Sequence, residues 1–168
     1  MTPQEIHEQL NRKFAGSLLE FNDTVLQPWI KVQPADVDRI ARYLRDDDAL
    51  QFDFLMCLSG VDLGEVLGVV YHLYSTVRDH KIVLRTETPR TRPEVKSVAA
   101  LWRTADWHER EAYDMLGITF IQHPDLRRIL LPDDWEGFPL RKDYIQPEFY
   151  NGIRVPHPDQ KEGGDDVE

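Results

Sequence analysis

The dipeptide His108-Glu109 is the strongest hint of catalytic chemistry in the sequence. Zinc proteases carry His-Glu-x-x-His on a helix, where two histidines one turn apart bind the metal and the glutamate is the general base. The position of the second histidine is occupied here by Ala112. The motif lacks a metal ligand, so the sequence predicts no metal site, and a metal-dependent hydrolase is an alternative that rests on this dipeptide alone.

Glu109 and Glu111 form a second arrangement that would suit general acid–base catalysis. On a helix the two side chains point roughly 200° apart, so they cannot share a site. Glu109 falls on the same face as Ala112 and Leu116, where a carboxylate needs a polar partner. Asp106 stands three residues earlier, which is the spacing of a capping box, and we expect Glu109 to bond the helix start. A functional role for Glu109 is the alternative.

The remaining motifs point away from cofactor chemistry on this chain. No Gly-x-Gly-x-x-Gly or phosphate-binding loop is present, and no serine stands in a nucleophile elbow. The single cysteine, Cys57, can form neither an internal disulfide nor a cysteine-bound cluster. We therefore expect no catalytic, cofactor-binding or metal-binding residues here.

Composition limits the class of protein further. The chain has 168 residues, of which 41% are hydrophobic, as in one folded domain with tails. Its formal net charge of -10 argues against a nucleic-acid binder. No apolar run approaches the roughly 20 residues of a membrane-spanning helix, and no secretory signal is visible. We expect the chain to reside in a reducing compartment and to associate with a membrane only through partner proteins.

Hydrophobic periodicity predicts the elements that position these residues. The patterns favour helices over residues 3–20, 35–45, 95–102 and 106–117, and strands over residues 24–32, 52–58, 66–77, 81–87 and 118–121. Pro28 suggests that the first strand lies at an edge or carries a bulge. Gly117 is expected to end the last helix in the left-handed conformation. The order predicts an α+β domain over residues 1–121, with helices on one face of a mainly antiparallel sheet.

The last predicted helix also carries charged and aromatic residues away from its apolar side. Arg110 and Asp114 lie one turn apart and can pair. Trp107 stands on the same side, and tryptophan and arginine are both enriched at protein interfaces. A solvated charged face is the alternative, and spacing alone leaves both open.

Residues 122–150 show no period and are too polar for a core loop and too aromatic for a free linker. Two basic doublets, Arg127-Arg128 and Arg141-Lys142, alternate with acidic and aromatic residues. We expect an extended arm that docks on a partner, with arginines reaching carboxylates. The acidic segment 151–168 is expected to be flexible. The predicted interface residues are Trp107, Arg110, Asp114, His123, Arg127, Arg128, Trp135, Arg141, Lys142 and Tyr144.

Two blocks within this region resemble a known family. The run Glu-Arg-Glu-Ala-Tyr-Asp-Met-Leu-Gly-Ile-Thr-Phe-Ile-Gln-His-Pro-Asp-Leu-Arg-Arg-Ile-Leu covers residues 109–130, and Asp-Trp-Glu-Gly-Phe-Pro-Leu-Arg-Lys-Asp-Tyr covers residues 134–144. Both are similar to the signature of the C subunit of respiratory NADH:quinone oxidoreductase (complex I). The similarity extends over most of residues 20–145.

The resemblance implies a non-catalytic α+β scaffold in the peripheral arm of a proton-pumping complex, an enzyme only as part of that assembly. It implies contacts with subunits homologous to the large and small subunits of hydrogenases, near the site of quinone reduction. FMN, iron–sulfur clusters and quinone would then lie on partner subunits, and the complex on the cytoplasmic side of the bacterial inner membrane. A homologous subunit of a membrane-bound hydrogenase-type complex is the alternative.

Overall fold

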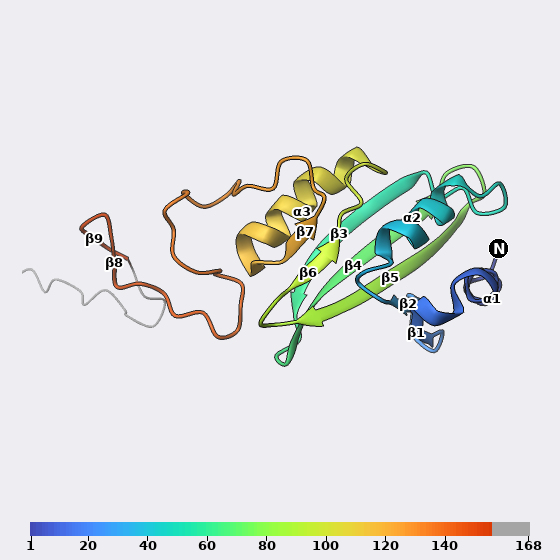
Figure 1. The fold of residues 1–168 in the computed structure, drawn as a ribbon, viewed down its shortest axis with the longest axis horizontal. Helices are drawn as coiled ribbons and strands as arrows, with labels where there is room; N and C mark the ends of the chain where they lie inside the picture. Colours follow the sequence, from blue (N-terminus) through green and yellow to red (C-terminus); the bar gives the residue numbers. More distant parts are fainter. Residues whose placement is uncertain (156–168) are drawn as a thin grey trace, which may run out of the picture.

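The computed structural model describes residues 1–155, and the rest of the predicted flexible tail, residues 156–168, lies outside the described residues. Figure 1 shows a sheet with helices in front of it, followed by an irregular arm that extends away from the sheet. Along the chain, a helix is followed by two strands, and the later helices and strands follow one another without a regular alternation. No repeated β-α-β unit occurs among the described residues.

The principal sheet has five strands in the order β1-β2-β5-β4-β3. They are β1 (Leu18–Asn22), β2 (Trp29–Val32), β3 (Phe54–Asp62), β4 (Val66–Ser75) and β5 (His80–Pro89). Within this sheet, only the β2–β5 pair is parallel. The sheet is therefore mainly antiparallel, as predicted, and the hairpin of β4 and β5 forms its centre.

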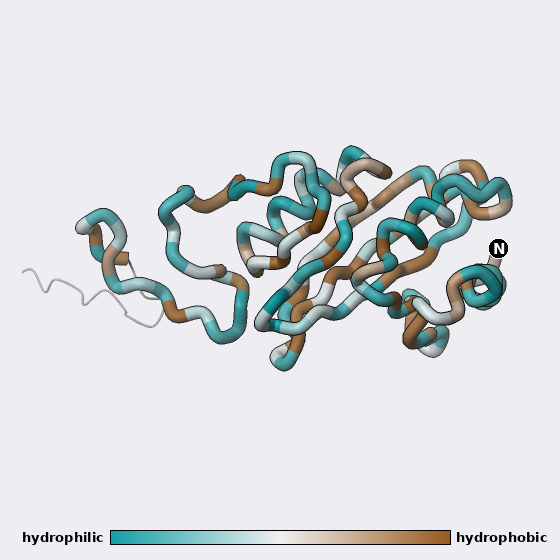
Figure 2. The backbone as a smooth tube through the Cα atoms, viewed as in Figure 1, coloured by the Kyte–Doolittle hydropathy of each residue, from teal (hydrophilic) through white to brown (hydrophobic). Residues whose placement is uncertain are grey.

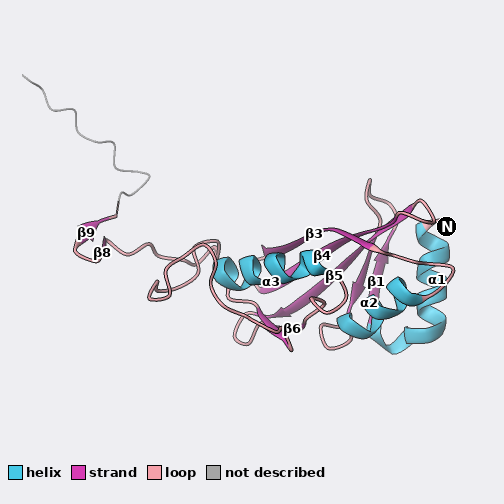
Figure 3. Cartoon of the chain, turned by 90° about the horizontal axis from the view of Figure 1, so that it is seen from above, coloured by secondary structure: helices cyan, strands magenta, loops and turns pink. Residues whose placement is uncertain are grey.

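Three α-helices accompany this sheet: α1 (Pro3–Phe14), α2 (Val37–Asp46) and α3 (Arg103–Leu116). Figures 1 and 3 place them on the same side of the strands. α1 begins with a capping box in which Thr2 and Glu5 bond each other's backbone N–H groups. The predicted α+β class is confirmed.

The core lies between the helices and one face of the sheet. Along β4 the side chains of Leu67, Val69, Tyr71 and Leu73 are all buried, which follows from the two-residue period of a strand. The apolar stripe of α2, which includes Ile40 and Leu44, is fully buried as well. Figure 2 shows hydrophobic residues gathered along the strands that pass behind α2 and α3.

Two early predictions need correction. The first helix ends at Phe14 instead of residue 20, because a short 3₁₀ turn, Ala15–Ser17, leads directly into β1. The strand predicted at an edge, β2, has neighbours on both sides. Pro28 is accommodated because it precedes the first strand residue and offers only its carbonyl, which accepts the N–H of Val83 at 3.4 Å.

The helix predicted over residues 95–102 is wrong. Residues Glu94–Lys96 form a short strand, β6, which pairs in parallel with β7 (Thr119–Ile121), the predicted last strand. Turns follow β6, and α3 starts at Arg103. Gly117 ends α3 with φ of +71°, which confirms the predicted left-handed cap. Near the end of the described chain, β8 (Phe149–Tyr150) and β9 (Ile153–Arg154) form a small hairpin.

Candidate docking surface

Glu109 is a buried structural carboxylate, and its predicted place in a capping box is wrong. It lies within α3, six residues after the helix start, and is 0% exposed. Its carboxylate accepts the hydroxyl hydrogen of Ser97 at 2.6 Å and the backbone N–H of Val98 at 2.7 Å. Burial raises the pKa of Glu109 to about 7, although both hydrogen bonds favour the charged form. The side chain fastens the segment after β6 to α3.

His123 joins this buried group from the first residues of the arm. Its Nε2 lies 3.2 Å from the carboxylate of Asp106 and 3.9 Å from that of Glu109. Its Nδ1 accepts the backbone N–H of Asp125 at 3.0 Å, so the other nitrogen is the donor in a neutral ring. The side chains of His123 and Glu109 are fully buried. The group attaches the first residues of the arm to α3.

Asp114 organises the beginning of the arm. Its Oδ2 accepts three backbone N–H groups, those of Ile129 at 2.9 Å, Leu130 at 2.7 Å and Leu131 at 3.1 Å. Its Oδ1 lies 2.8 Å from the guanidinium of Arg128. Burial alone would raise the pKa of Asp114, but these four donors outweigh it and hold the pKa below its usual range. The carboxylate therefore stays charged in the interior and fixes the path of the chain.

Arg128 extends the same organisation further along the arm. Besides its pair with Asp114, the guanidinium donates to the carbonyl oxygens of Trp135 at 3.1 Å and Gly137 at 3.2 Å. It also lies over the ring of Phe138, 5.4 Å from the centroid. One planar cation with several donors thus closes residues 128–138 into a loop.

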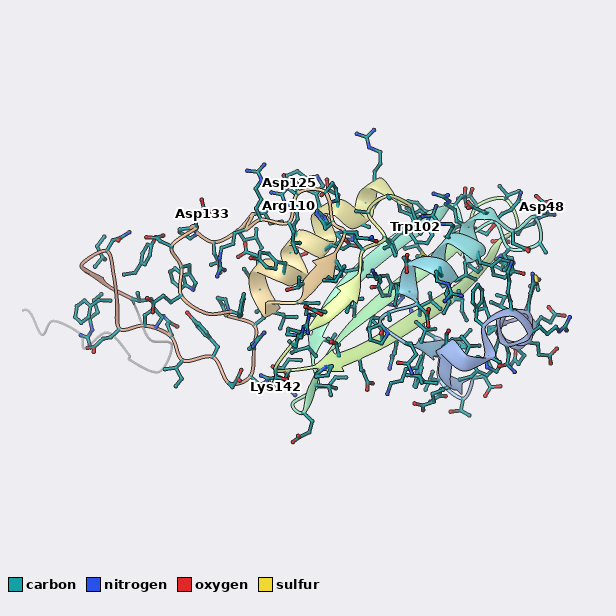
Figure 4. The ribbon with its side chains drawn as sticks, viewed as in Figure 1. Asp48, Trp102, Arg110, Asp125, Asp133 and Lys142 are labelled. Carbon is teal, nitrogen blue, oxygen red and sulfur yellow. The ribbon has the colours of Figure 1, made fainter. Side chains whose placement is uncertain are left out.

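Arg110 does not form the predicted pair with Asp114, which already has other donors. Only 6% of Arg110 is exposed, its Nε donates to the carbonyl of Arg127, and its guanidinium stacks over Trp107. Figure 4 shows Arg110 close to Asp125 of the arm. The predicted outward charged face is therefore wrong for Arg110 and Asp114, because the chain's own arm covers them. Trp107 remains 60% exposed.

A second contact joins the arm to the end of α3. The Nε of Arg141 donates to the carbonyl of Leu116 at 2.6 Å, where a cation also complements the helix dipole. The same guanidinium lies over the ring of Phe138, 4.7 Å from the centroid. A Cβ on Gly117 would stand 2.5 Å from Phe138, so the position requires glycine for both its φ and its space.

A third contact ties the arm to the sheet. Arg90 makes a bidentate pair with Asp62 at the end of β3, at 2.7 and 2.8 Å, and reaches Asp143 of the arm at 2.6 Å. The N–H of Lys142 also donates to Asp62 at 2.8 Å. The paired guanidinium keeps the pKa of Asp62 well below its usual range. The arm is thus attached to the domain at three separated points.

Aromatic residues hold the rest of the arm together. The indole N–H of Trp135 donates to the hydroxyl of Tyr144 at 3.1 Å, and the Trp135 ring lies 5.0 Å from that of Tyr150. Tyr150 in turn donates to Asp134 at 2.8 Å. Trp135 and Tyr144 are both half-buried by these contacts.

The arm turns charged side chains and several large apolar side chains to solvent. Of the ten predicted interface residues, Trp107, Arg127 and Lys142 are exposed. Spacing did not single out the apolar residues that the arm turns to solvent. They are Leu130, Leu140, Ile145, Phe149 and Ile153, between 57% and 88% exposed. The sequence does carry a signal for these exposed residues. They are large apolar residues in a segment that has neither a helical nor a strand periodicity. We call these five residues the apolar arm surface.

Metal and membrane features are not found in the described chain. Within residues 1–155, no three side chains of histidine, cysteine, aspartate or glutamate are grouped as metal ligands would be. His108, which began the zinc-protease pattern, accepts the backbone N–H of Leu58 with its Nδ1 at 3.2 Å. Within the same residues, each helix is too short or too polar to cross a bilayer.

The comparison with protein families decides what this architecture is. Residues 30–150 match the model of the respiratory-chain NADH dehydrogenase 30-kDa subunit. The chain belongs to this family. The match includes α3, the Asp114 contacts and the arm as far as Tyr150, so the organised arm is part of the family's domain.

Family members with curated names are similar over most of the chain. A protein from Chlorobium phaeobacteroides, named as the C subunit of NADH-quinone oxidoreductase, is 44% identical over 155 residues, which cover 90% of this chain and 93% of that protein. One of the same name from Chloroherpeton thalassium is 46% identical over 159 residues. That alignment covers 92% of this chain but 66% of the relative, so the chain spans about two thirds of its length.

Solved structures agree on the fold of this family member. A trypsin-resistant fragment (1–134) of Nqo5 superimposes with a TM-score of 0.61 at 28% identity, covering 75% of this chain and all of the fragment. A chain of an archaeal membrane-bound sulfane sulfur reductase superimposes with a TM-score of 0.68 and covers 84% of this chain. At 21% identity the second likeness concerns the fold alone.

Proposed function

We propose that this chain is a non-catalytic scaffold subunit in the peripheral arm of a proton-pumping NADH:quinone oxidoreductase. Its family, and relatives named as the C subunit of that enzyme, support a place in the complex. The observation that carries the scaffold role is the arm: Asp114, Arg128 and Arg90 fix its backbone, while its large apolar side chains face outward.

This arrangement favours binding because contacts within the chain already order the arm before a partner binds. A free segment would lose backbone and side-chain freedom on association, which weakens the complex. Here three contacts with the domain already hold the path of the arm. Burial of apolar surface by a partner then contributes directly, at about 25 cal/mol for each Å². The exposed charged residues of the arm, among them Arg127 and Lys142, would supply the polar rim of such an interface.

The redox chemistry belongs to partners in this proposal. FMN, iron–sulfur clusters and quinone would be held by other subunits, and this chain would dock the quinone-site subunit that resembles hydrogenase large subunits and its adjacent iron–sulfur neighbour. The complex would face the cytoplasmic side of the bacterial inner membrane, with this chain peripheral. The structural roles found for Glu109, His123 and Asp114 support a scaffold, since each of these side chains is engaged within the chain.

Affinity purification of the tagged full chain from gently solubilised membranes tests the proposal. The expected result is co-purification with FMN- and iron–sulfur-containing subunits and with NADH:quinone reductase activity. Recovery of the chain alone, from membranes that retain this activity in another fraction, would contradict it.

A homologous subunit of a membrane-bound hydrogenase-type complex is the second candidate. The observation in its favour is that the fold also occurs in the sulfane sulfur reductase, described as an archaeal respiratory membrane complex. The same purification separates the two candidates. A nickel-containing large subunit in the purified complex, without NADH-oxidising subunits, would favour the second.

A further inference from the structure

The face of the sheet opposite the helices carries a second candidate binding surface, separate from the arm. The strand registers place Trp29, His72, Lys81 and Arg85 on this outer face, because their neighbours Ile30, Leu73, Ile82 and Leu84 point into the core. A bulge in β3 next to Cys57, opposite His72, leaves Met56 51% exposed beside them. Figure 3 shows the helices on the other side of the strands.

A small apolar cavity opens on this face. Its volume is about 100 Å³, and its lining includes Pro3 at the start of α1 together with Pro28, Met56, His72, Lys81 and Val83. This is smaller than the cavity of ~150 Å³ that holds benzene in another protein, and well below the ~300 Å³ at which drug-sized sites begin. The cavity therefore fits one apolar side chain better than a cofactor or a lipid chain.

The charge beside this cavity is positive, in contrast to the chain as a whole at -10. Lys81 lines the cavity and, within residues 1–155, has no ion-pair partner. Arg85 lies over the ring of Trp29, 4.6 Å from its centroid, and also lacks a carboxylate partner in the described chain. Glu87, on the same face, is already paired with Lys31 at 2.6 Å. No acidic residue lines the cavity.

We infer that the outer sheet face binds a segment of a partner protein in which an apolar side chain, filling the cavity, is flanked by a carboxylate that pairs with Lys81. Arg85 is placed to receive a second carboxylate along the strand direction, since Lys81 and Arg85 are four residues apart on one face of β5. An apolar anchor in a pocket with a charged rim is the usual arrangement of an interface centre. The inference rests on the proposed function in one respect: the proposed function says to which complex the partner protein belongs.

Two other occupants fit less well. A second copy of this chain, joined through the same face by a two-fold axis, would bring Lys81 and Arg85 of both copies together with no carboxylate available for them. An anionic membrane surface is recognised by clusters of roughly four to eight basic residues. This face offers Lys31, Lys81 and Arg85, of which Lys31 is already paired.

Site-specific photo-cross-linking in the assembled complex tests the inference. The full chain would carry the photoreactive residue p-benzoylphenylalanine in place of exposed Met56, with a matched probe in place of exposed Arg42 on α2. Illumination of membranes, purification and mass spectrometry then identify the cross-linked peptide. We expect the Met56 probe to link to another protein at an apolar residue with Asp or Glu within about three positions, and the Arg42 probe to miss that segment.

Charge variants supply the second part of the test. In the Met56 probe background, Lys81→Glu should lower the yield of this cross-link at least about tenfold, while Lys81→Arg should retain it. Equal yields in both variants would overturn the inference, as would cross-links to lipid, to a second copy, or to a segment without acidic residues. A probe-bearing chain that co-purifies with the respiratory subunits but gives no protein cross-link overturns this inference alone. Cross-linking to an acidic segment of a protein outside any respiratory complex would instead overturn the proposed function.

Discussion

The carboxylate of Asp114 on α3 and the guanidinium of Arg128 on the arm lie 2.8 Å apart inside the chain. Three backbone N–H groups of the arm bond the same carboxylate. Charged residues in this region thus shape the arm, which turns the five side chains of the apolar arm surface to solvent.

Replacing Asp114 with Ala should loosen the arm and destabilise the domain. The change leaves the Arg128 guanidinium and three backbone N–H groups without their acceptor, and breaking a buried pair costs about 3–5 kcal/mol. Urea denaturation would measure the loss, and limited trypsin digestion should show faster cleavage after Arg127 and Arg128. Asp114→Asn, which keeps one oxygen acceptor, should lose less. Equal stability of Asp114→Ala and the wild type would contradict the role given to this carboxylate.

Arg127 and Arg128 should behave differently although they are adjacent. Arg127 is exposed and, among residues 1–155, pairs only with exposed Asp125, so Arg127→Ala should change stability by less than about 0.5 kcal/mol. Arg128→Ala removes hydrogen bonds to a buried carboxylate and to two carbonyls, at an expected cost of about 2–3 kcal/mol. Denaturation midpoints of the two single variants compare them directly. Matching midpoints would mean that Arg128 does not organise the arm.

Gly117→Ala should destabilise the protein for two reasons, and Gly64→Ala separates them. Both glycines have positive φ, which costs other residues about 1–2 kcal/mol. A Cβ at Gly64 meets no atom within 4 Å, whereas one at Gly117 meets Phe138 at 2.5 Å and Arg141 at 2.8 Å. Thermal unfolding should therefore show the larger loss for Gly117→Ala. If the two losses agree, the contact between the arm and the end of α3 contributes nothing.

Glu109 should give the stability an unusual pH dependence. Its pKa is about 7 in the folded chain, above its usual value, so the folded state holds a proton that the unfolded state has released between about pH 4.5 and 7. Its contribution is fully present below this window and is lost as pH rises through it, by at most about 3.5 kcal/mol at roughly 1.4 kcal/mol for each pH unit. Asp114, whose pKa is lowered, acts in the opposite direction at more acidic pH.

The Glu109→Gln variant isolates this contribution. Gln keeps an acceptor for the N–H of Val98 but cannot ionise, so the free energy of unfolding of the variant should fall less between pH 4.5 and 7 than that of the wild type. Denaturant titrations at several pH values measure the two slopes. Parallel curves would show that Glu109 does not retain its proton in the folded chain.

Local periodicity predicted the elements whose partners are close in sequence. The stripe of Ile40 and Leu44 gave α2, and the alternation around Tyr71 gave the central hairpin, because burial of one face leaves a regular pattern. Val95 and Val98 also fit a helical spacing, yet Val95 lies in a strand whose partner, Phe120, is 25 residues later. Pairing over such a distance leaves no local pattern.

The location of the arm was predictable from the sequence, whereas its contacts were not, and its docking role stays a prediction. Composition and family resemblance indicated an arm over residues 122–150, and the structure describes an organised arm there. The direction of each charged side chain depends on distant partners: Asp114 bonds residues 129–131, and Arg90 reaches Asp143. Glu109 was expected to bond the helix start but bonds Ser97 and Val98, which precede the helix. Helical spacing alone cannot show such contacts.

The central claim is that the apolar arm surface docks this chain on its partners, and Ile145→Asp tests it most directly. Ile145 is 88% exposed, so the change should leave the unfolding midpoint unaltered. Val77→Asp, a matched change of a 66% exposed residue in the turn between β4 and β5, is the control. The measurement is the amount of iron–sulfur subunits that co-purify with each tagged variant from the same quantity of membrane. We predict at least about a tenfold loss for Ile145→Asp and none for Val77→Asp, whereas full recovery with Ile145→Asp would contradict the claim.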